Sequence, residues 1–97
     1  MNIHIALYKW KDPADSREIA EILADIAALA GKIPGILQIH AGVNTSPYGA
    51  GYTHVIMVRA ENKAAIEAYK AHPNHIKAAN RVELMEEHGI GVDFSTD

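Results

Sequence analysis

The 97-residue sequence contains no cysteine, which excludes disulfide bonds, thiolate metal ligands and cysteine nucleophiles together. Charged residues interrupt every hydrophobic stretch well before the roughly 18 residues that a membrane span needs. The first residues, Met1 to His4, also lack the basic start and apolar core of a signal peptide. Nine Lys and Arg against twelve Asp and Glu give a net charge of −3, which argues against a nucleic-acid binder. We therefore expect a cytoplasmic protein with neither a nucleic-acid nor a membrane partner.

The length and the apolar content together indicate one small globular domain over residues 1–97. An apolar share of 48% and a charged share of 22% are ordinary for a folded protein and exclude a disordered chain. A chain of this size buries little more than ~60% of the surface it exposes when unfolded, so a partner subunit would add stability. Six histidines stand out, because histidine is the side chain whose ordinary pKa of about 6.5 lies closest to neutrality.

Four segments have the β-branched content or the alternation typical of strands and lie between turn residues, at 3–11, 36–44, 52–60 and 90–94. The alternation at 36–44 favours an edge strand. Apolar residues at helical spacing predict a first helix between the first two strands and a second after the third strand. The order β-α-β-β-α-β predicts an α+β fold, a ferredoxin-like antiparallel sheet with helices on one face.

The ends of the helices are marked by capping residues and by proline. Asp15 followed by Glu18 resembles a capping box at the start of the helix over 15–31, and Asn62 is suited to cap the next helix. Pro73 ends that helix and is suited to start a further helical segment. This segment is expected to continue towards Glu87 and to stop at Gly89.

The strand over 3–11 carries apolar side chains on both of its faces, with Ile3, Ile5 and Leu7 on one side and Ala6, Tyr8 and Trp10 on the other. The strand over 52–60 repeats this pattern. Helices of such a fold cover one face of the sheet, so a second copy packed face to face is the simplest cover for the other. The alternative is an ordinary surface with scattered apolar atoms. We expect the homodimer through face-to-face sheets.

Motifs for metals, nucleotides and nucleophilic serines are weak or incomplete. A pair such as His72-x-x-His75 falls short of the three protein ligands of a catalytic zinc site, and the proline prevents regular helical placement. Gly49-x-Gly51 lacks the third glycine of a dinucleotide fingerprint. No serine has the strand-turn-helix context of a hydrolase nucleophile. We expect no metal and no cofactor.

Several motifs together resemble the stress-responsive A/B barrel domain family over nearly the whole chain. They are His4 with Leu7-Tyr8-Lys9-Trp10-Lys11, Ile33-Pro34-Gly35, Gly42-x-Asn44-x-Ser46, Gly51-Tyr52-Thr53-His54 and, the most specific, Ala68-Tyr69-x-x-His72-Pro73-x-His75. The resemblance implies a dimeric α+β barrel with a pocket between each sheet and its own helices. It implies no single reaction, since one branch of the family contains cofactor-free polyketide cyclases and most members have no assigned activity.

Cyclase chemistry needs a base that removes a proton next to a carbonyl and a donor that stabilises the resulting oxyanion, and histidine and tyrosine can supply both. Resemblance to the cyclase branch places the base at His75 and its partner at Tyr69, with His4 as a further catalytic residue. His54 is expected to line the same pocket, and His72 is a candidate for ligand contact. Each of these side chains also has a structural interpretation: buried hydrogen-bonded imidazoles, a core tyrosine, and a histidine that holds a turn.

Two classes of function follow. The first is a small homodimeric protein that binds a small apolar or carbonyl-containing molecule and performs cofactor-free proton transfer of a cyclase, isomerase or lyase type. The alternative is a non-enzymatic, structural stress-responsive protein. A cavity bordered by His4, Tyr69 and His75 would favour the first, and side chains filling that space would favour the second. An oxygenase of the same fold is a third interpretation that rests on analogy alone.

Overall fold

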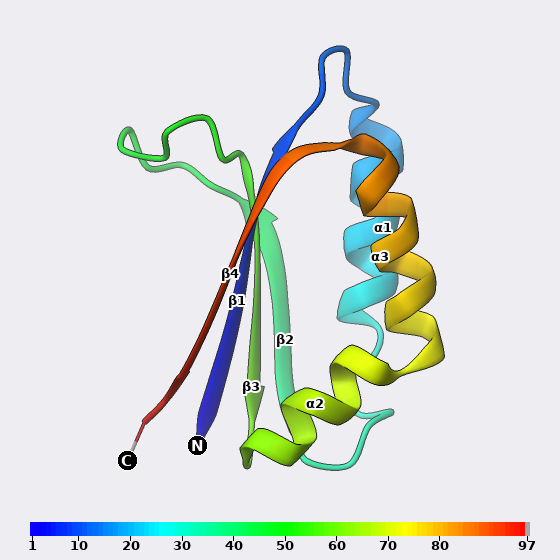
Figure 1. Cartoon of the computed structure of the whole chain (residues 1–97), viewed down its shortest axis with the longest axis vertical. Coiled ribbons are helices and arrows are strands. Elements are labelled where there is room, and N and C mark those ends of the chain that lie inside the picture. Colours follow the sequence, from blue (N-terminus) through cyan, green and yellow to red (C-terminus); the bar gives the residue numbers. More distant parts are fainter. Residues whose placement is uncertain (97) are drawn as a thin grey trace.

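Four antiparallel strands form a sheet in the order β2-β3-β1-β4, and three helices lie against one of its faces (Figure 1). This architecture comes from a computed structural model, which describes residues 1–96. The elements are β1 (Asn2–Trp10), α1 (Ser16–Ala27), β2 (Ile36–Val43), β3 (His54–Ala60), α2 (Lys63–Ala71), α3 (Pro73–Met85) and β4 (Glu86–Ser95). Within residues 1–96, no helix combines the length and the apolar character needed to cross a membrane. The ferredoxin-like α+β fold is confirmed, and β2 is an edge strand as expected.

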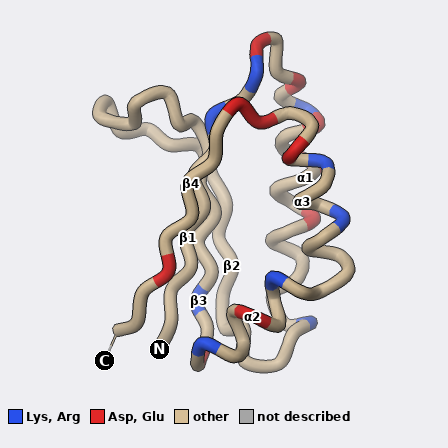
Figure 2. The backbone as a smooth tube through the Cα atoms, viewed as in Figure 1, with Lys and Arg blue, Asp and Glu red and all other residues tan. Residues whose placement is uncertain are grey.

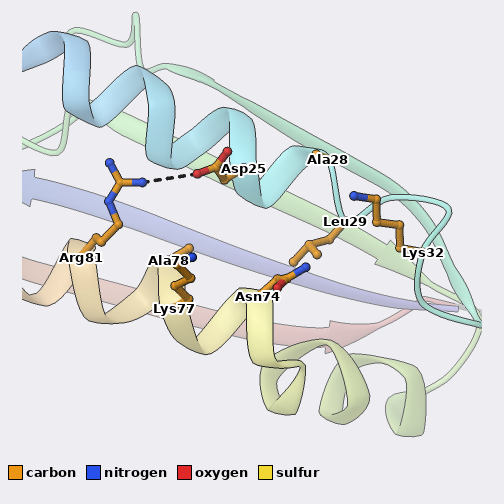
Figure 3. A pocket seen from close by; sticks show the side chains of 8 residues that line it. All are labelled: Asp25, Ala28, Leu29, Lys32, Asn74, Lys77, Ala78 and Arg81. Carbon is orange, nitrogen blue, oxygen red and sulfur yellow. Dashed lines mark hydrogen bonds and ion pairs between the residues drawn. The ribbon is translucent and has the colours of Figure 1, made fainter.

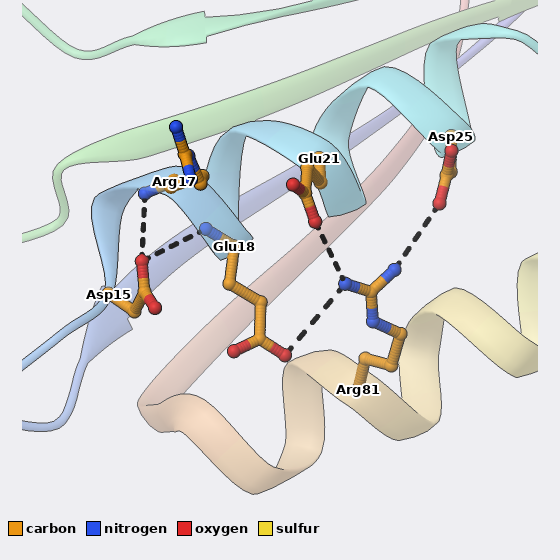
Figure 4. Close-up of polar contacts among 6 residues, drawn as sticks. All are labelled: Asp15, Arg17, Glu18, Glu21, Asp25 and Arg81. Carbon is orange, nitrogen blue, oxygen red and sulfur yellow. Dashed lines mark hydrogen bonds and ion pairs between the residues drawn. The ribbon is translucent and has the colours of Figure 1, made fainter.

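The predicted capping residues begin two of the helices. The Asp15 carboxylate accepts hydrogen bonds from the backbone N–H groups of Arg17 (3.0 Å) and Glu18 (3.2 Å) at the start of α1 (Figure 4). The Asn62 side chain accepts from the backbone N–H of Ala65 at 2.9 Å and begins α2. Each cap satisfies N–H groups that have no partner inside the helix, an effect worth about 1 kcal/mol.

The break between α2 and α3 lies at His72, as the proline predicted. His72 has an extended backbone (φ −63°, ψ 134°), and Pro73 is the first residue of α3. The His72 ring accepts a hydrogen bond from the backbone N–H of Asn74 at 3.1 Å through Nδ1. The chain therefore changes direction within one residue, and α3 starts close to the end of α2.

The last strand begins earlier than expected, so the prediction of a helix towards Glu87 that stops at Gly89 is wrong. The helix α3 ends at Met85, and the residues that follow pair with β1: Trp10 opposite Glu86, Lys9 opposite His88 and Tyr8 opposite Gly89. This pairing provides hydrogen-bond partners for the end of β1 that a longer helix would leave unsatisfied. The register shifts between Lys9 and Trp10, which is where a bulge accommodates the entering strand.

The core lies between the sheet and the helices. Its buried apolar side chains come from every helix and from β2 and β3. They are Ile19, Ile22, Leu23, Ile26, Leu29, Ile33, Ile36, Ile39, Ile56, Val58, Ala60, Ala65, Ile66, Tyr69, Ala78 and Val82. The strand β1 adds partly buried side chains to this cluster, so its helix-facing side contributes to the core without being sealed.

On the solvent side of the helices, one arginine joins α3 to α1. The Arg81 guanidinium lies 3.3 Å from Asp25, 3.7 Å from Glu21 and 3.8 Å from Glu18 (Figure 4). All four side chains are about a third exposed or more, so each pair contributes little to stability. The network orients the two helices more than it stabilises them.

The other face of the sheet carries a continuous apolar surface. Ile3, Ile5 and Leu7 of β1 lie opposite Phe94, Val92 and Ile90 of β4, so all six side chains project to the same side. The three residues of β4 are 37–45% exposed. Figure 2 shows that the strands hold few charged residues, and Figure 1 shows that no helix covers this side of the sheet within residues 1–96. We call this surface the open face.

Candidate functional site

A cavity of about 360 Å³ lies between the helix-facing side of β1 and the helices. The alternation of β1 directs His4 and Tyr8 into this space. The helical period of α3 brings His75, Ala79 and Val82 to the same face. The complete lining is His4, Tyr8, Ile26, Lys70, His75, Ala79, Val82 and Glu86. The cavity therefore joins polar groups from two strands and two helices to an apolar wall.

The His75 imidazole is held with one nitrogen bound and the other free. Its Nδ1–H donates to the backbone carbonyl of Lys70 at 3.1 Å. That carbonyl belongs to the last turn of α2, where carbonyls have no donor within the helix. Because Nδ1 carries the proton, Nε2 keeps its lone pair in the neutral ring. Burial lowers the pKa of His75 and nearby His4 lowers it further, although the Lys70 hydrogen bond acts in the opposite direction. The ring is consequently neutral and basic near pH 7.

The Tyr69 ring lies between the two histidines of the cavity. Its centroid is 4.5 Å from that of His75 and 6.0 Å from that of His4, and the residue is 1% exposed. The Tyr69 hydroxyl has no hydrogen-bond partner within residues 1–96. Every fully buried polar side-chain atom in these residues does have a partner, so this hydroxyl is not fully buried. The small exposed area must therefore include the hydroxyl. Burial raises the pKa of Tyr69, and Tyr8 adds to this effect, so the phenol stays protonated.

His4 is held by a carboxylate that the sequence did not single out. Its Nδ1 lies 2.5 Å from Oδ1 of Asp93, whose Oδ2 accepts from Lys70 Nζ at 2.7 Å. The hydrogen bond from Lys70 and that from His4 lower the pKa of Asp93, which is therefore ionised and accepts the His4 proton. The register places His4 opposite Asp93 on the same side of the sheet. The one signal in the sequence is the charged residue at 93 between the apolar Val92 and Phe94.

His54 does not share this cavity, so the expectation that His4 and His54 line one pocket is not met. His54 lies opposite Tyr8, whereas His4 lies opposite Val58, four positions along the strand pair. The His54 Nδ1 accepts from the indole N–H of Trp10 at 2.9 Å, and burial lowers its pKa. The ring borders a separate, mostly apolar hollow between α1 and β2.

The five predicted site residues thus separate into two groups. His4 and His75 line the cavity, and the Tyr69 ring lies beside both imidazoles without being part of the lining. His54 and His72 lie outside its lining, and the His72 side chain caps α3. Sequence reasoning missed Tyr8, Lys70, Glu86 and Asp93. Tyr8, Glu86 and Asp93 are brought together by pairing between β1 and β4, and Lys70 reaches Asp93 from α2.

The groove between α1 and α3 does not carry acid–base groups of this kind. Figure 3 shows a groove between α1 and α3, lined by Asp25, Ala28, Leu29, Lys32, Asn74, Lys77, Ala78 and Arg81. This groove holds no histidine or tyrosine, and Arg81 is engaged by Asp25. Within residues 1–96, no three side chains of the His, Cys, Asp and Glu types are grouped to hold a metal ion.

Curated plant proteins are similar to this chain in sequence. One stress-response A/B barrel domain-containing protein of Arabidopsis thaliana is 37% identical over 86 residues, which cover 84% of this chain and 31% of that protein. A second, shorter protein of the same description and organism is 32% identical over 78 residues, or 78% of this chain and 72% of that protein. The chain spans less than a third of the length of the first of these relatives.

Solved structures share the fold over the full length. An Arabidopsis thaliana protein is 26% identical with a TM-score of 0.86, over 100% of this chain and 96% of that one. A dimeric ferredoxin-like protein from Jannaschia is 22% identical with a TM-score of 0.88, over 98% of both chains. The hydroxynitrile lyase of Passiflora edulis is 18% identical with a TM-score of 0.85, over 99% of this chain and 93% of that one. The model of the stress-responsive A/B barrel domain matches residues 3–96, and the chain belongs to that family.

Proposed function

We propose that this protein binds a small carbonyl compound in the cavity and catalyses cofactor-free proton transfer on it. The observation that carries the proposal is the hydrogen bond from His75 Nδ1–H to the Lys70 carbonyl. This bond leaves Nε2 as an available base in a ring that also lines the cavity. A buried, protonated tyrosine lies against the same ring.

The proposed reaction begins with a carbonyl oxygen of the ligand accepting a hydrogen bond from the Tyr69 hydroxyl. Nε2 of His75 then removes a proton from the carbon next to the carbonyl. The electron pair of that C–H bond moves into the enolate, whose oxygen Tyr69 stabilises. The imidazolium returns the proton to carbon or oxygen of the product, which restores the neutral base and leaves no net change in the protein.

His4, held by Asp93, supplies a second imidazole to the proposed site. With Nδ1–H donated to the Asp93 carboxylate, Nε2 of His4 is free to accept a proton or a ligand hydroxyl. Lys70 holds Asp93 in place at 2.7 Å, so His4 has a fixed orientation.

The open space favours a binding role over the alternative of a purely structural stress protein. His4 and His75 border a cavity instead of filling it, and the Tyr69 hydroxyl beside them is left without a partner within residues 1–96. A similar fold also belongs to an enzyme, the hydroxynitrile lyase of Passiflora edulis, which supports the view that such a scaffold can host catalysis.

We further propose that two copies associate through their open faces. Large contiguous apolar patches mark interaction surfaces, and here two central strands and an edge strand contribute to one. Sheets packed face to face lie about 10 Å apart, which would bury these side chains in a shared core. Similar solved proteins from Thermobifida fusca, Bacteroides fragilis and Jannaschia are described as dimeric and of ferredoxin-like fold.

Exchange of a ketone's α-protons for deuterium tests the proposed chemistry before any substrate is known. The probe is 4-phenylbutan-2-one in D₂O, followed by proton NMR with and without the protein. We expect the protein to accelerate exchange, the variant His75→Ala to reduce this acceleration at least about 100-fold, and Tyr69→Phe to reduce it less. Arg17→Ala, at an exposed position of α1, is the control. Equal acceleration by the parent and His75→Ala would disprove histidine catalysis at this site.

A further inference from the structure

The cavity extends along β1 from His4 to Tyr8. His4 and Tyr8 both line it and lie four residues apart on the strand, a separation of about 13 Å between their Cα atoms. His75, Lys70 and Asp93 gather at the His4 end. The apolar side chains of Ile26, Ala79 and Val82 complete the lining from the helices. A ligand that fills the cavity would therefore have a second end beside Tyr8, away from the His4 end.

Tyr8 supplies a hydrogen-bond donor at that second end. Its ring stacks on Trp10 at a centroid distance of 5.2 Å and an angle of 21°, which fixes its position. The Tyr8 hydroxyl has no partner within residues 1–96, and it is not one of the fully buried atoms there. Burial and the neighbouring Glu86 raise the pKa of Tyr8 to about 12, so the hydroxyl keeps its proton.

Glu86 supplies an acceptor beside Tyr8. It is the first residue of β4, and its side chain lines the cavity. The carboxylate lies over Gly89, because a methyl group on Gly89 would stand 2.7 Å from Oε2 of Glu86. Gly89 is the register partner of Tyr8, so the carboxylate and the phenol belong to neighbouring positions on the sheet. Within residues 1–96, this carboxylate forms neither an ion pair nor a hydrogen bond.

We propose that Tyr8 and Glu86 form a subsite for a hydroxyl group at the far end of the ligand. The ligand oxygen accepts from the Tyr8 hydroxyl, and the ligand O–H donates to the Glu86 carboxylate. This inference rests on the proposed function, and it names the substrate class: a neutral carbonyl compound with an apolar middle and a terminal hydroxyl.

The two closest competitors satisfy one of the two groups at most. A terminal carboxylate would meet Glu86 as a like charge and would bring no proton to it. A terminal ammonium would donate to Glu86 but has no lone pair to accept the Tyr8 proton. A hydroxyl satisfies both groups at once, because it donates one hydrogen bond and accepts another.

Four matched probes test the subsite by isothermal titration calorimetry on the intact protein. They are 4-phenylbutan-2-one and its para-hydroxy, para-carboxy and para-aminomethyl derivatives, which share the ketone and differ only at the far end. We expect the phenol to bind about tenfold more tightly than the unsubstituted ketone, and the carboxylate to bind more weakly than it. Tighter binding of the ammonium than of the phenol would overturn the proposal.

Variants at the subsite separate this inference from the proposed function. Tyr8→Phe and Glu86→Gln should each remove most of the preference for the phenol, and Glu86→Gln should also restore binding of the carboxylate. Gly89→Ala should weaken the preference by displacing the flexible end of Glu86, with the melting temperature as a check on the fold. All of these variants should retain binding of the unsubstituted ketone, and none should abolish its His75-dependent deuterium exchange.

The possible failures are distinguishable. If all four probes bind equally and His75 is still needed for exchange, the subsite is wrong and the proposed function survives. If none binds and none exchanges, the subsite and the proposed function are both overturned. If the phenol is preferred but Tyr8→Phe and Glu86→Gln keep that preference, the hydroxyl is recognised elsewhere and the assignment of this subsite is wrong.

Discussion

The two faces of the sheet differ most clearly on β1, where one strand serves two purposes. On the side facing the helices it places His4 and Tyr8 in the cavity. On the open face it places Ile3, Ile5 and Leu7 beside Ile90, Val92 and Phe94 of β4. Successive side chains of a strand point to opposite sides, so a polar site and an apolar surface are separated by only one residue.

The two faces also differ in the contacts that their side chains need. On the helix-facing side, polar groups are held by specific partners such as Lys70 and Asp93, and a cavity remains. On the open face, the side chains of β1 and β4 are apolar, and a second surface would remove them from water. The helices of one chain therefore suffice to organise the candidate site, whereas the open face calls for a partner.

The largest expected effect is on the open face. Ile5→Asp or Val55→Asp should bring an unpaired carboxylate into the proposed interface and raise the dimer dissociation constant by at least about 1,000-fold. Analytical ultracentrifugation at micromolar concentration should show a dimer for the parent and a monomer or unfolded chain for the variants. Ala14→Asp, in an exposed segment after β1, is the control. A parent that sediments as a stable monomer without binding an exposed-surface dye would contradict the dimer.

The pH dependence of α-proton exchange tests the helix-facing side. Because burial lowers the pKa of His75, the neutral base should persist below pH 6.5, and exchange should fall about tenfold per pH unit below that lowered pKa. Burial raises the pKa of Tyr69, so no alkaline decline is expected until above the ordinary tyrosine range near pH 10. A rate that falls steadily from pH 7 to 9 would be inconsistent with these assignments.

The lowered pKa of His75 also makes the free energy of unfolding depend on pH. The unfolded chain binds a proton at His75 more readily than the folded chain, so the free energy of unfolding should decrease as the pH falls below about 6.5. Urea denaturation of the parent and of His75→Ala at pH 7 and pH 5 measures this contribution. We expect the parent to lose more stability than the variant between the two pH values; an equal loss would show that His75 is not responsible.

A smaller effect is expected from the carboxylate that positions His4. Asp93→Asn keeps the size of the side chain but removes the charge that fixes the His4 proton on Nδ1. We expect about a tenfold loss of exchange activity and a shift of the His4 tautomer, read from nitrogen NMR shifts. The Asp93 side chain is half exposed, so the melting temperature should change little. An unaltered tautomer would argue against this positioning role.

The smallest effect is expected at Arg81, on the solvent side of the helices. Its three partners are exposed, so Arg81→Ala should cost at most about 1 kcal/mol of the free energy of unfolding. Chemical denaturation gives this value directly. Deuterium exchange of the ketone probe should be unchanged, because Arg81 does not line the cavity. A marked loss of exchange would mean that the α1–α3 contact shapes the site.

Local features of the fold followed from residues that are neighbours in the sequence. Asp15 and Asn62 begin helices because their side chains accept from N–H groups two or three residues ahead. Pro73 separates α2 from α3 because its ring restricts the residue before it. The resemblance to the family also named His4, Tyr69 and His75; their rings lie close together in the fold, and their roles stay a prediction.

Features that depend on pairing between distant segments could not be predicted from residues that are neighbours in the sequence. The strand β4 starts at Glu86 because β1 pairs with it along its whole length, from Asn2 to Trp10. The backbone hydrogen bonds of this pairing replace the helix that the sequence pattern predicted up to Gly89. His4 meets Asp93 across 89 positions of sequence because of strand register, and that register also separates His4 from His54. A shift of one residue would turn each of these side chains to the opposite face.

Local sequence therefore set the type of each element and most of the element boundaries. It also set the helix break and the chemical difference between the two faces of β1. These features depend on capping, on proline geometry and on alternation, which act over a few residues. Which polar groups meet was set by the folded chain alone: the Lys70–Asp93–His4 contacts, the orientation of His75 Nε2, and the Tyr8–Glu86 end of the cavity. The physical reason is that these contacts join β1, α2, α3 and β4, and their geometry is fixed by strand register and helix packing over the whole domain.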